Sequence, residues 1–379
     1  MSSPAAPAAQ RITAIDIARF MGIFLVYYGH VVERMMYLGN GTAALQYKFI
    51  YSFHMPMFFV LAGFIAKDLS AQMGVGQFAK SRLMSRVVPF AFFNLLLLVL
   101  ALLFPRDFPP IPLNSFSDYL GGVLSTLINL PVFNIPTWFL MCLVSVEILH
   151  YALFRFLRDS DLRILLAMAA FYVAGYVLND QLNLTRLGDP LRWNWWFMNE
   201  ALVMYPFYLL GVLLRRRGFL TLAWPAWLTA LLSALAFAAV ALTYDLNQGP
   251  FKLGIKAVVI VASGHGSMLW FPITAVIGSL GLLLAARIMP PWGWACFMGR
   301  NALILFCLNG VVYHHINGPL AAWFNGALPA AWWSVSLFAA LVSVASLAMA
   351  AVLVLVLNRW LPQLTGRPGV AGPLLPRLL

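Results

Sequence analysis

The stretch Asp16-Ile-Ala-Arg19-Phe-Met-Gly-Ile-Phe-Leu-Val-Tyr-Tyr-Gly-His30 places three ionisable residues inside the first apolar segment of the chain. Arg19 and His30 are eleven positions apart, so on an α-helix they differ by only about 20° in direction and by about 16 Å along the axis. Asp16 lies one turn before Arg19, near the same face. A charge within a membrane span is costly unless it faces a polar interior, so this stripe predicts a functional site. The alternative is an Asp16–Arg19 pair at the cytoplasmic rim and a histidine that only packs.

Composition assigns the chain to the integral membrane proteins. It is 62% hydrophobic and 9% charged, with a mean hydropathy of +0.85, far from soluble averages. The first residues lack a basic region, so we expect the first apolar stretch to be an uncleaved span. Neither HExxH nor CxxC spacing occurs, and we expect no metal site.

Apolar runs of spanning length predict an all-α bundle of about ten transmembrane helices in one domain, residues 15–358. Short cytoplasmic tails, 1–14 and 359–379, flank that domain. The predicted spans are 15–34, 47–66, 86–104, 136–157, 163–179, 198–214, 223–244, 267–287, 300–317 and 333–357.

The distribution of basic residues predicts the orientation. With the N-terminus inside, sixteen of the 24 Lys and Arg residues fall on the cytoplasmic side, seven fall outside, and Arg19 lies within a span. This bias obeys the positive-inside rule and predicts that both termini are cytoplasmic. It also explains the net charge of +12 without a nucleic-acid partner. The two longest outer loops, about 105–135 and 245–266, either fold back over a site or only connect helices.

The predicted depth of each remaining ionisable residue in the membrane indicates which of them lie at the same level. His30 lies near the outer end of the first span, and His54 lies on the second span, which runs back, so we expect both near the outer side. Arg82 and Arg86 lie one turn apart on the cytoplasmic side, before the third span. Other ionisable groups are Glu147 and His150 in the middle of the fourth span, Glu200 at the start of the sixth, and His314 and His315 at the end of the ninth.

Several motifs resemble those of the acyltransferase-3 family of membrane O-acyltransferases, and the resemblance extends over essentially the whole chain. They are Arg11-Ile-Thr-Ala-Ile-Asp16-Ile-Ala-Arg19 with the ten-residue spacing to His30, Phe53-His54-Met55-Pro56-Met57-Phe58-Phe59-Val60-Leu61-Ala62-Gly63-Phe64, Lys80-Ser81-Arg82 with Arg86 and Pro89, Pro136-Thr137-Trp138-Phe139-Leu140, and Tyr205-Pro206-Phe207-Tyr208-Leu209-Leu210-Gly211.

The resemblance implies ten helices in a bacterial inner membrane and transfer of an acyl group, usually acetyl, from cytoplasmic acetyl-CoA. The acceptor it implies is a hydroxyl on an envelope or secreted glycan. Some members of the family carry a fused extracytoplasmic domain, which we do not expect in this chain, so polyols, lipids and antibiotics stay open as acceptors.

O-acylation needs a base that removes the proton of the attacking hydroxyl, and histidine titrates in the right range. We expect His30 to be that base, with Glu147 or His54 holding its tautomer. For His54, the alternative is that it only packs and caps beside Pro56. His314 and His315 fit the membrane interface better than catalysis.

Guanidinium groups match phosphate oxygens, so we expect Arg19, Arg82 and Arg86 to bind the CoA phosphates. The alternative for Arg82 and Arg86 is that they only anchor the topology. We expect Asp16, Trp138 and Glu200 to contact the substrates. Two other functions stay open: a transporter of a sugar or anionic substrate, and a non-catalytic membrane partner.

Overall fold

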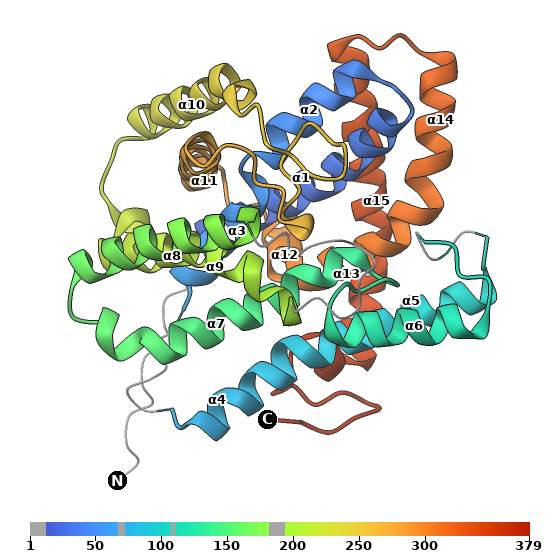
Figure 1. Ribbon diagram of the computed structural model, residues 1–379, viewed down its shortest axis with the longest axis horizontal. Helices are drawn as coiled ribbons and strands as arrows, with labels where there is room; N and C mark the ends of the chain where they lie inside the picture. The colour runs from blue at the N-terminus through green and yellow to red at the C-terminus, as the bar shows by residue number, and fades with distance from the viewer. Residues whose placement is uncertain (1–12, 67–72, 107, 109–110, 182–193) are drawn as a thin grey trace.

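Helix α1 (Thr13–Tyr37) runs through the middle of the molecule and packs against helices from the beginning and the end of the chain (Figure 1). The described residues are 13–66, 73–106, 108, 111–181 and 194–379 of a computed structural model. In these residues the secondary structure is helical, apart from one isolated bridge between Val259 and Gly264. The predicted all-α membrane bundle is therefore confirmed.

In the described part of the chain, eight helices are long and apolar enough to cross a membrane. A ninth candidate is the pair α12 (Gly293–Arg300) and α13 (Ala302–Val312), which is bent by 79°. The eight are α1, the stretch α4 (Val75–Arg82) to α5 (Val88–Leu103), α7 (Trp138–Leu157), α8 (Asp161–Gln181), α9 (Met198–Arg216), α10 (Ala226–Thr243), α11 (Trp270–Ile288) and α15 (Trp332–Trp360).

The predicted second span is divided into α2 (Gly41–Tyr51) and α3 (His54–Phe64). Pro56 explains the division. In one continuous helix its ring would clash with the carbonyl of Ser52, and that carbonyl would lose its bonding partner. In the first turn of α3, by contrast, Pro56 removes no hydrogen bond that the helix needs.

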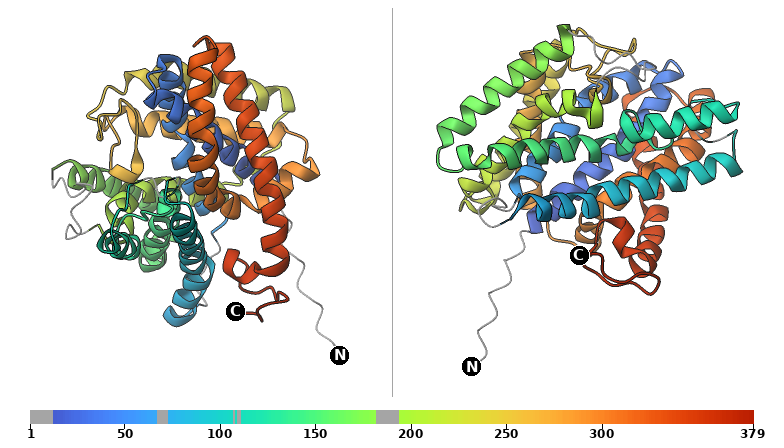
Figure 2. Two further views of the ribbon diagram at one scale, coloured as in Figure 1. Left: turned by 90° about the vertical axis from the view of Figure 1, so that its right-hand side faces the viewer. Right: turned by 60° about the horizontal axis from the view of Figure 1, so that its bottom comes forward.

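Two short π-helical segments interrupt the long helices. The first, Leu83–Val87, joins α4 to α5, and the second, Tyr313–Asn317, joins α13 to α14 (Gly318–Ala327). Helix α14 lies beside α15 in Figures 1 and 2, where the Phe324 and Phe338 rings meet at 4.7 Å. Such π-helical segments are frequent at functional sites.

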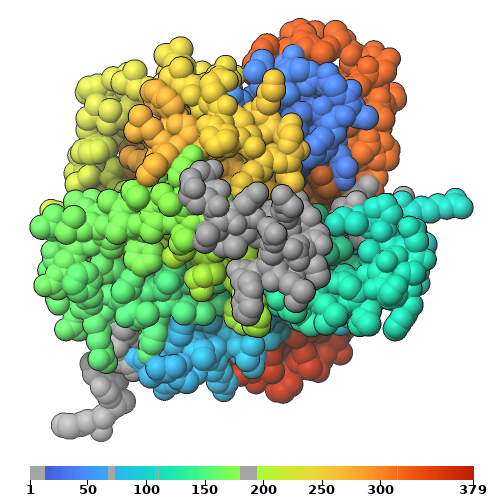
Figure 3. Space-filling view, viewed as in Figure 1, coloured from blue at the N-terminus to red at the C-terminus, as the bar shows by residue number. Residues whose placement is uncertain are grey.

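The two long predicted outer loops both fold back onto the bundle. The first contains helix α6 (Phe116–Ile128), which begins with a capping box between Ser115 and Asp118. The second, residues 247–269, covers the end of the bundle beside α2, as the yellow-to-gold surface in Figure 3 shows.

Glycines bring α3 and α9 into direct backbone contact. A Cβ atom on Gly63 would lie 1.9 Å from the carbonyl oxygen of Tyr208, and one on Gly211 would lie 1.9 Å from that of Val60. Because bilayer helices associate through close packing, small residues at such positions allow the approach. This contact fixes α3, and with it His54, against the core.

Topology is the first testable prediction. Reporter fusions after Gly218, between α9 and α10, should read cytoplasmic, whereas fusions after Asn114, before α6, should read exterior. The physical reason is the surplus of basic residues on the predicted inner side. A swapped result would overturn the orientation and the donor side that depends on it.

Candidate active site

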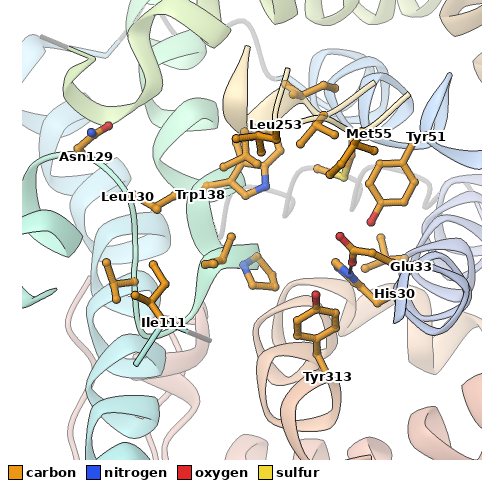
Figure 4. Close-up of a pocket in the computed structure, with 18 of the residues that line it drawn as sticks. His30, Glu33, Tyr51, Met55, Ile111, Asn129, Leu130, Trp138, Leu253 and Tyr313 are labelled. Atoms are coloured by element: carbon orange, nitrogen blue, oxygen red, sulfur yellow. Dashed lines mark hydrogen bonds and ion pairs between the residues drawn. The ribbon is translucent and has the colours of Figure 1, made fainter. Parts of the chain in front are cut away.

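A cavity of about 900 Å³ opens between the end of α1, the α2–α3 break, the start of α7 and the two folded-back loops (Figure 4). Of the residues predicted for the site, His30, His54 and Trp138 line it. The structure thus brings together the two histidines that the sequence placed at similar depth. Six other predicted residues do not line this cavity: Asp16, Arg19, Arg82, Arg86, Glu147 and Glu200.

His30 is held by a carboxylate on its own helix. Its Nδ1 lies 2.7 Å from Oε2 of Glu33, one turn further along α1. The second carboxylate oxygen accepts a hydrogen bond from the hydroxyl of Tyr37 at 3.3 Å. An ionised carboxylate only accepts hydrogen bonds, so Nδ1 is the donor of this bond, and in the neutral ring Nε2 then carries the lone pair. This is the arrangement that prepares a histidine to remove a proton.

Tyrosines surround the pair. The Tyr313 ring lies 4.9 Å from the His30 ring, and the Tyr51 ring lies 6.5 Å from it on another side. Figure 4 shows both phenol hydroxyls directed toward His30 and Glu33. Tyr313 belongs to the second π-helical segment, and the Arg34 guanidinium lies over its ring at 3.9 Å.

His54 lines the cavity and also bridges the α2–α3 break. Its Nδ1 donates to the carbonyl oxygen of Ile50 at 3.0 Å, and its ring packs against Tyr51 at 4.5 Å. A carbonyl oxygen has no hydrogen to donate, so this bond also fixes the tautomer of His54. His54 therefore both binds a carbonyl oxygen at the end of α2 and lines the cavity.

A second polar cluster lies where α7 meets the first π-helical segment. Arg82 and Arg86 each place a guanidinium nitrogen 3.2 Å from Oε1 of Glu147. The structure thus places Glu147 with the two arginines and not beside His30. Nearby, Nδ1 of His150 lies 3.3 Å from the Tyr205 hydroxyl.

Both arginines are mostly buried, with side-chain exposures of 14% and 21%. They therefore differ from solvent-exposed topological anchors. Two guanidiniums against one carboxylate leave one positive charge in excess. Oε2 of Glu147 and the Nε atoms of Arg82 and Arg86 have no hydrogen-bond partner among the described residues. An anionic ligand suits such a cluster.

Arg19 and Asp16 lie on the opening turns of α1, which is continuous from Thr13 to Tyr37 as predicted. Their closest ion-pair distance is 4.0 Å, and Asp16 is buried. The helical geometry thus places Arg19 and His30 on one face of one uninterrupted helix.

Glu200 is fully buried and attaches the second loop to α9. It accepts hydrogen bonds from Asn194 at 2.7 Å and from the hydroxyl of Ser263. Residues 259–261 of the same loop line the cavity, so this bond holds part of its wall. In that loop, burial together with the charge of Lys252 lowers the pKa of His265 to about 3, which keeps its ring neutral.

Glu33, Tyr51 and Tyr313 were not among the site residues predicted from the sequence. A local signal existed for Glu33, because an acidic residue three positions after a candidate histidine lies on the same helical face. No comparable signal existed for Tyr313, which reaches the site from a distant helix.

Residues 12–355 match the model of a protein family described as "Acyltransferase domain". The chain belongs to this acyltransferase family. With its apolar helices it is a multi-pass membrane acyltransferase, and membership in this family argues against the transporter and partner alternatives.

Among curated proteins, the nodulation protein NolL of Mesorhizobium japonicum (strain LMG 29417 / CECT 9101 / MAFF 303099) is 26% identical over 208 residues. That alignment covers 54% of this chain and 48% of NolL, so the chain matches about half the length of this relative. No solved structure matches the acyltransferase.

The buried ion-pair cluster yields a stability prediction. Glu147→Ala leaves two buried guanidiniums unpaired, whereas Arg82→Ala leaves the Arg86–Glu147 pair intact. Breaking a buried pair costs about 3–5 kcal/mol, so Glu147→Ala should lower the thermal unfolding midpoint more than Arg82→Ala does. Arg155→Ala, an exposed arginine on the same helix α7, is the control and should change little. Equal midpoints for all three variants would contradict a stabilising cluster.

Proposed function

We propose that this acyltransferase moves an acetyl group from cytoplasmic acetyl-CoA to a hydroxyl of an envelope or secreted glycan, or of another hydroxylated acceptor. We place it in the inner membrane of a bacterium. The observation that carries the proposal is the His30–Glu33 hydrogen bond of 2.7 Å at the wall of a cavity, in a chain of an acyltransferase family.

In the proposed reaction, Nε2 of His30 takes the proton of the acceptor hydroxyl while the oxygen of that hydroxyl attacks the thioester carbonyl. The C–S bond then breaks, the ester forms, and the CoA sulfur takes the proton back from the imidazolium. Glu33 stabilises the imidazolium and keeps the ring oriented. The hydroxyl of Tyr51 supplies a donor for the oxygen on which negative charge develops.

We place the phosphates of the donor at Arg82 and Arg86, with Arg19 nearer the path along α1. A stretched pantetheine arm then covers the approximately 16 Å of helix between Arg19 and His30. Asp16 orients Arg19, Trp138 contacts the acceptor, and Glu200 holds the loop that covers it. His54 is a second polar group beside the reacting atoms.

The base is tested by His30→Ala. Acetyl transfer should fall at least about a hundredfold, the lower range for removal of a positioned acid–base group. Acetyl-CoA binding and the thermal midpoint should stay near those of the unmodified protein. His315→Ala removes an exposed histidine that does not line the cavity and should retain activity. Substantial turnover by a folded His30→Ala protein would exclude His30 as the base.

The positioning role is tested by Glu33→Gln. The amide keeps an acceptor for Nδ1 but removes the charge that stabilises the imidazolium, so kcat should fall at least about tenfold while KM for acetyl-CoA holds. Glu33→Asp should recover part of kcat. An unchanged kcat in the folded Gln variant would refute the role, and a rise in KM alone would indicate a binding role instead.

The donor site is tested by Arg82→Ala with two donors. One charge-assisted bond is worth about 1.5–3 kcal/mol, so KM for acetyl-CoA should rise roughly tenfold to a hundredfold. Turnover with S-acetylpantetheine, which lacks the phosphates, should be unaffected. Arg155→Ala is again the control. Parallel losses with both donors would indicate a structural defect and not a phosphate contact.

A further inference from the structure

The ionisable side chains of the described cavity lining are gathered at one end. His30, Glu33, Tyr51 and Tyr313 lie together there, whereas the opposite wall carries groups such as Ile111, Leu130 and Trp138, as Figure 4 shows. The cavity is thus amphipathic, with its reactive pair at the polar end.

Polar side chains are scarce along the apolar wall. In the described lining away from the His30 end they are Ser125, Asn129 and Trp138, whose indole N–H is a donor. The Ser125 hydroxyl donates to the carbonyl oxygen of Leu130 at 3.0 Å, so its proton is already engaged. Among the residues that the structure describes, this wall offers a ligand neither carboxylate nor guanidinium.

Part of the apolar wall comes from the loop after α10 and not from membrane-spanning helices. Leu253, Ile255 and Val261 lie in that loop and line the cavity, and Leu253 keeps 52% of its surface exposed. Loops outside the spans are ordinarily polar, and apolar side chains turned toward a pocket with a few convergent polar groups are typical of a site for an apolar ligand.

A bare oligosaccharide fits this wall poorly, because each hydroxyl that leaves water needs a new hydrogen-bond partner. An aliphatic or fused-ring body needs none and gains from burial. A cavity of about 900 Å³ is also in the range that holds a drug-sized molecule.

We infer that the acceptor is an amphiphile, whose hydroxyl meets His30 while its apolar body lies along the wall formed by α6, residues 129–136 and the loop at 253–261. A sugar joined to a lipid and a hydroxylated lipid share this chemistry. The inference rests on the proposed function, since it names the acceptor class for the same site.

The test uses the full chain in nanodiscs with acetyl-CoA and a series of β-glucosides whose alkyl group grows from methyl to octyl, with free glucose alongside. Transfer is followed by CoA release and by mass spectrometry of the ester. We expect kcat/KM to rise about fourfold per methylene until the wall is covered. A flat series, with glucose as good as octyl glucoside, overturns the inference.

Alkyl chains also partition into the bilayer, so matched variants separate that effect. Leu253→Asn and Val261→Asn make the wall polar, and asparagine tolerates the positive φ of 61° at residue 253. Both should flatten the dependence on chain length. Leu246→Asn, an exposed leucine near the same loop that does not line the cavity, should preserve it. The same slope in all variants overturns the inference.

Two further arms complete the design. With glucose as acceptor, acyl-CoA donors of increasing chain length should give the same kcat/KM profile in the unmodified protein and in the wall variants. If the wall variants instead remove a dependence on donor chain length, the wall binds the donor, and the inference is overturned. Shifts of the thermal midpoint report glucoside binding directly. Binding that depends on chain length and on the wall, without any transfer, would refute the proposed function while supporting the amphiphile site. Glucoside binding that does not depend on chain length or on the wall residues would refute the proposed amphiphile site.

Discussion

An ionisable side chain within a bilayer is stable only beside a partner, because hydrocarbon offers it nothing in place of water. Buried ionisable residues in the candidate spans of this acyltransferase follow that constraint. Arg82 and Arg86 share the carboxylate of Glu147 on α7. His30 meets Glu33 within one turn. Each of these interactions also fixes the position of a group that the proposed chemistry uses or of an element that encloses it.

Much of the fold could be predicted from the chain alone, because its dominant signal is local. The spacing of Arg19 and His30 requires only that α1 stay helical, and the length of each apolar run indicates a span. The position of His54 near His30 follows from two antiparallel segments. Pro56 could be seen in the sequence as well. Its consequence, the division of the second span, could not be predicted, because it depends on the residue at which the next helix begins.

The polar partners across the bundle were not predictable in this way. Glu147 is 65 positions from Arg82, and nothing in the local pattern distinguishes it from a residue that faces His30. Tyr313 reaches the cavity from the first residue of a π-helical segment that lies almost 300 positions after His30. Such contacts depend on tertiary packing, which one sequence does not display, and Glu33 was the exception that one helical turn could have revealed.

The reactive pair and the walls around it belong to different kinds of structure. His30 and Glu33 need only one turn of a buried helix, whereas the wall is supplied largely by segments that connect helices. Substitutions in those connections leave the turn intact, since no residue of the wall takes part in the hydrogen bond that orients His30. In a bundle built in this way, the residues that contact a substrate can change while the geometry of the His30–Glu33 pair, and with it the proposed proton transfer, is retained.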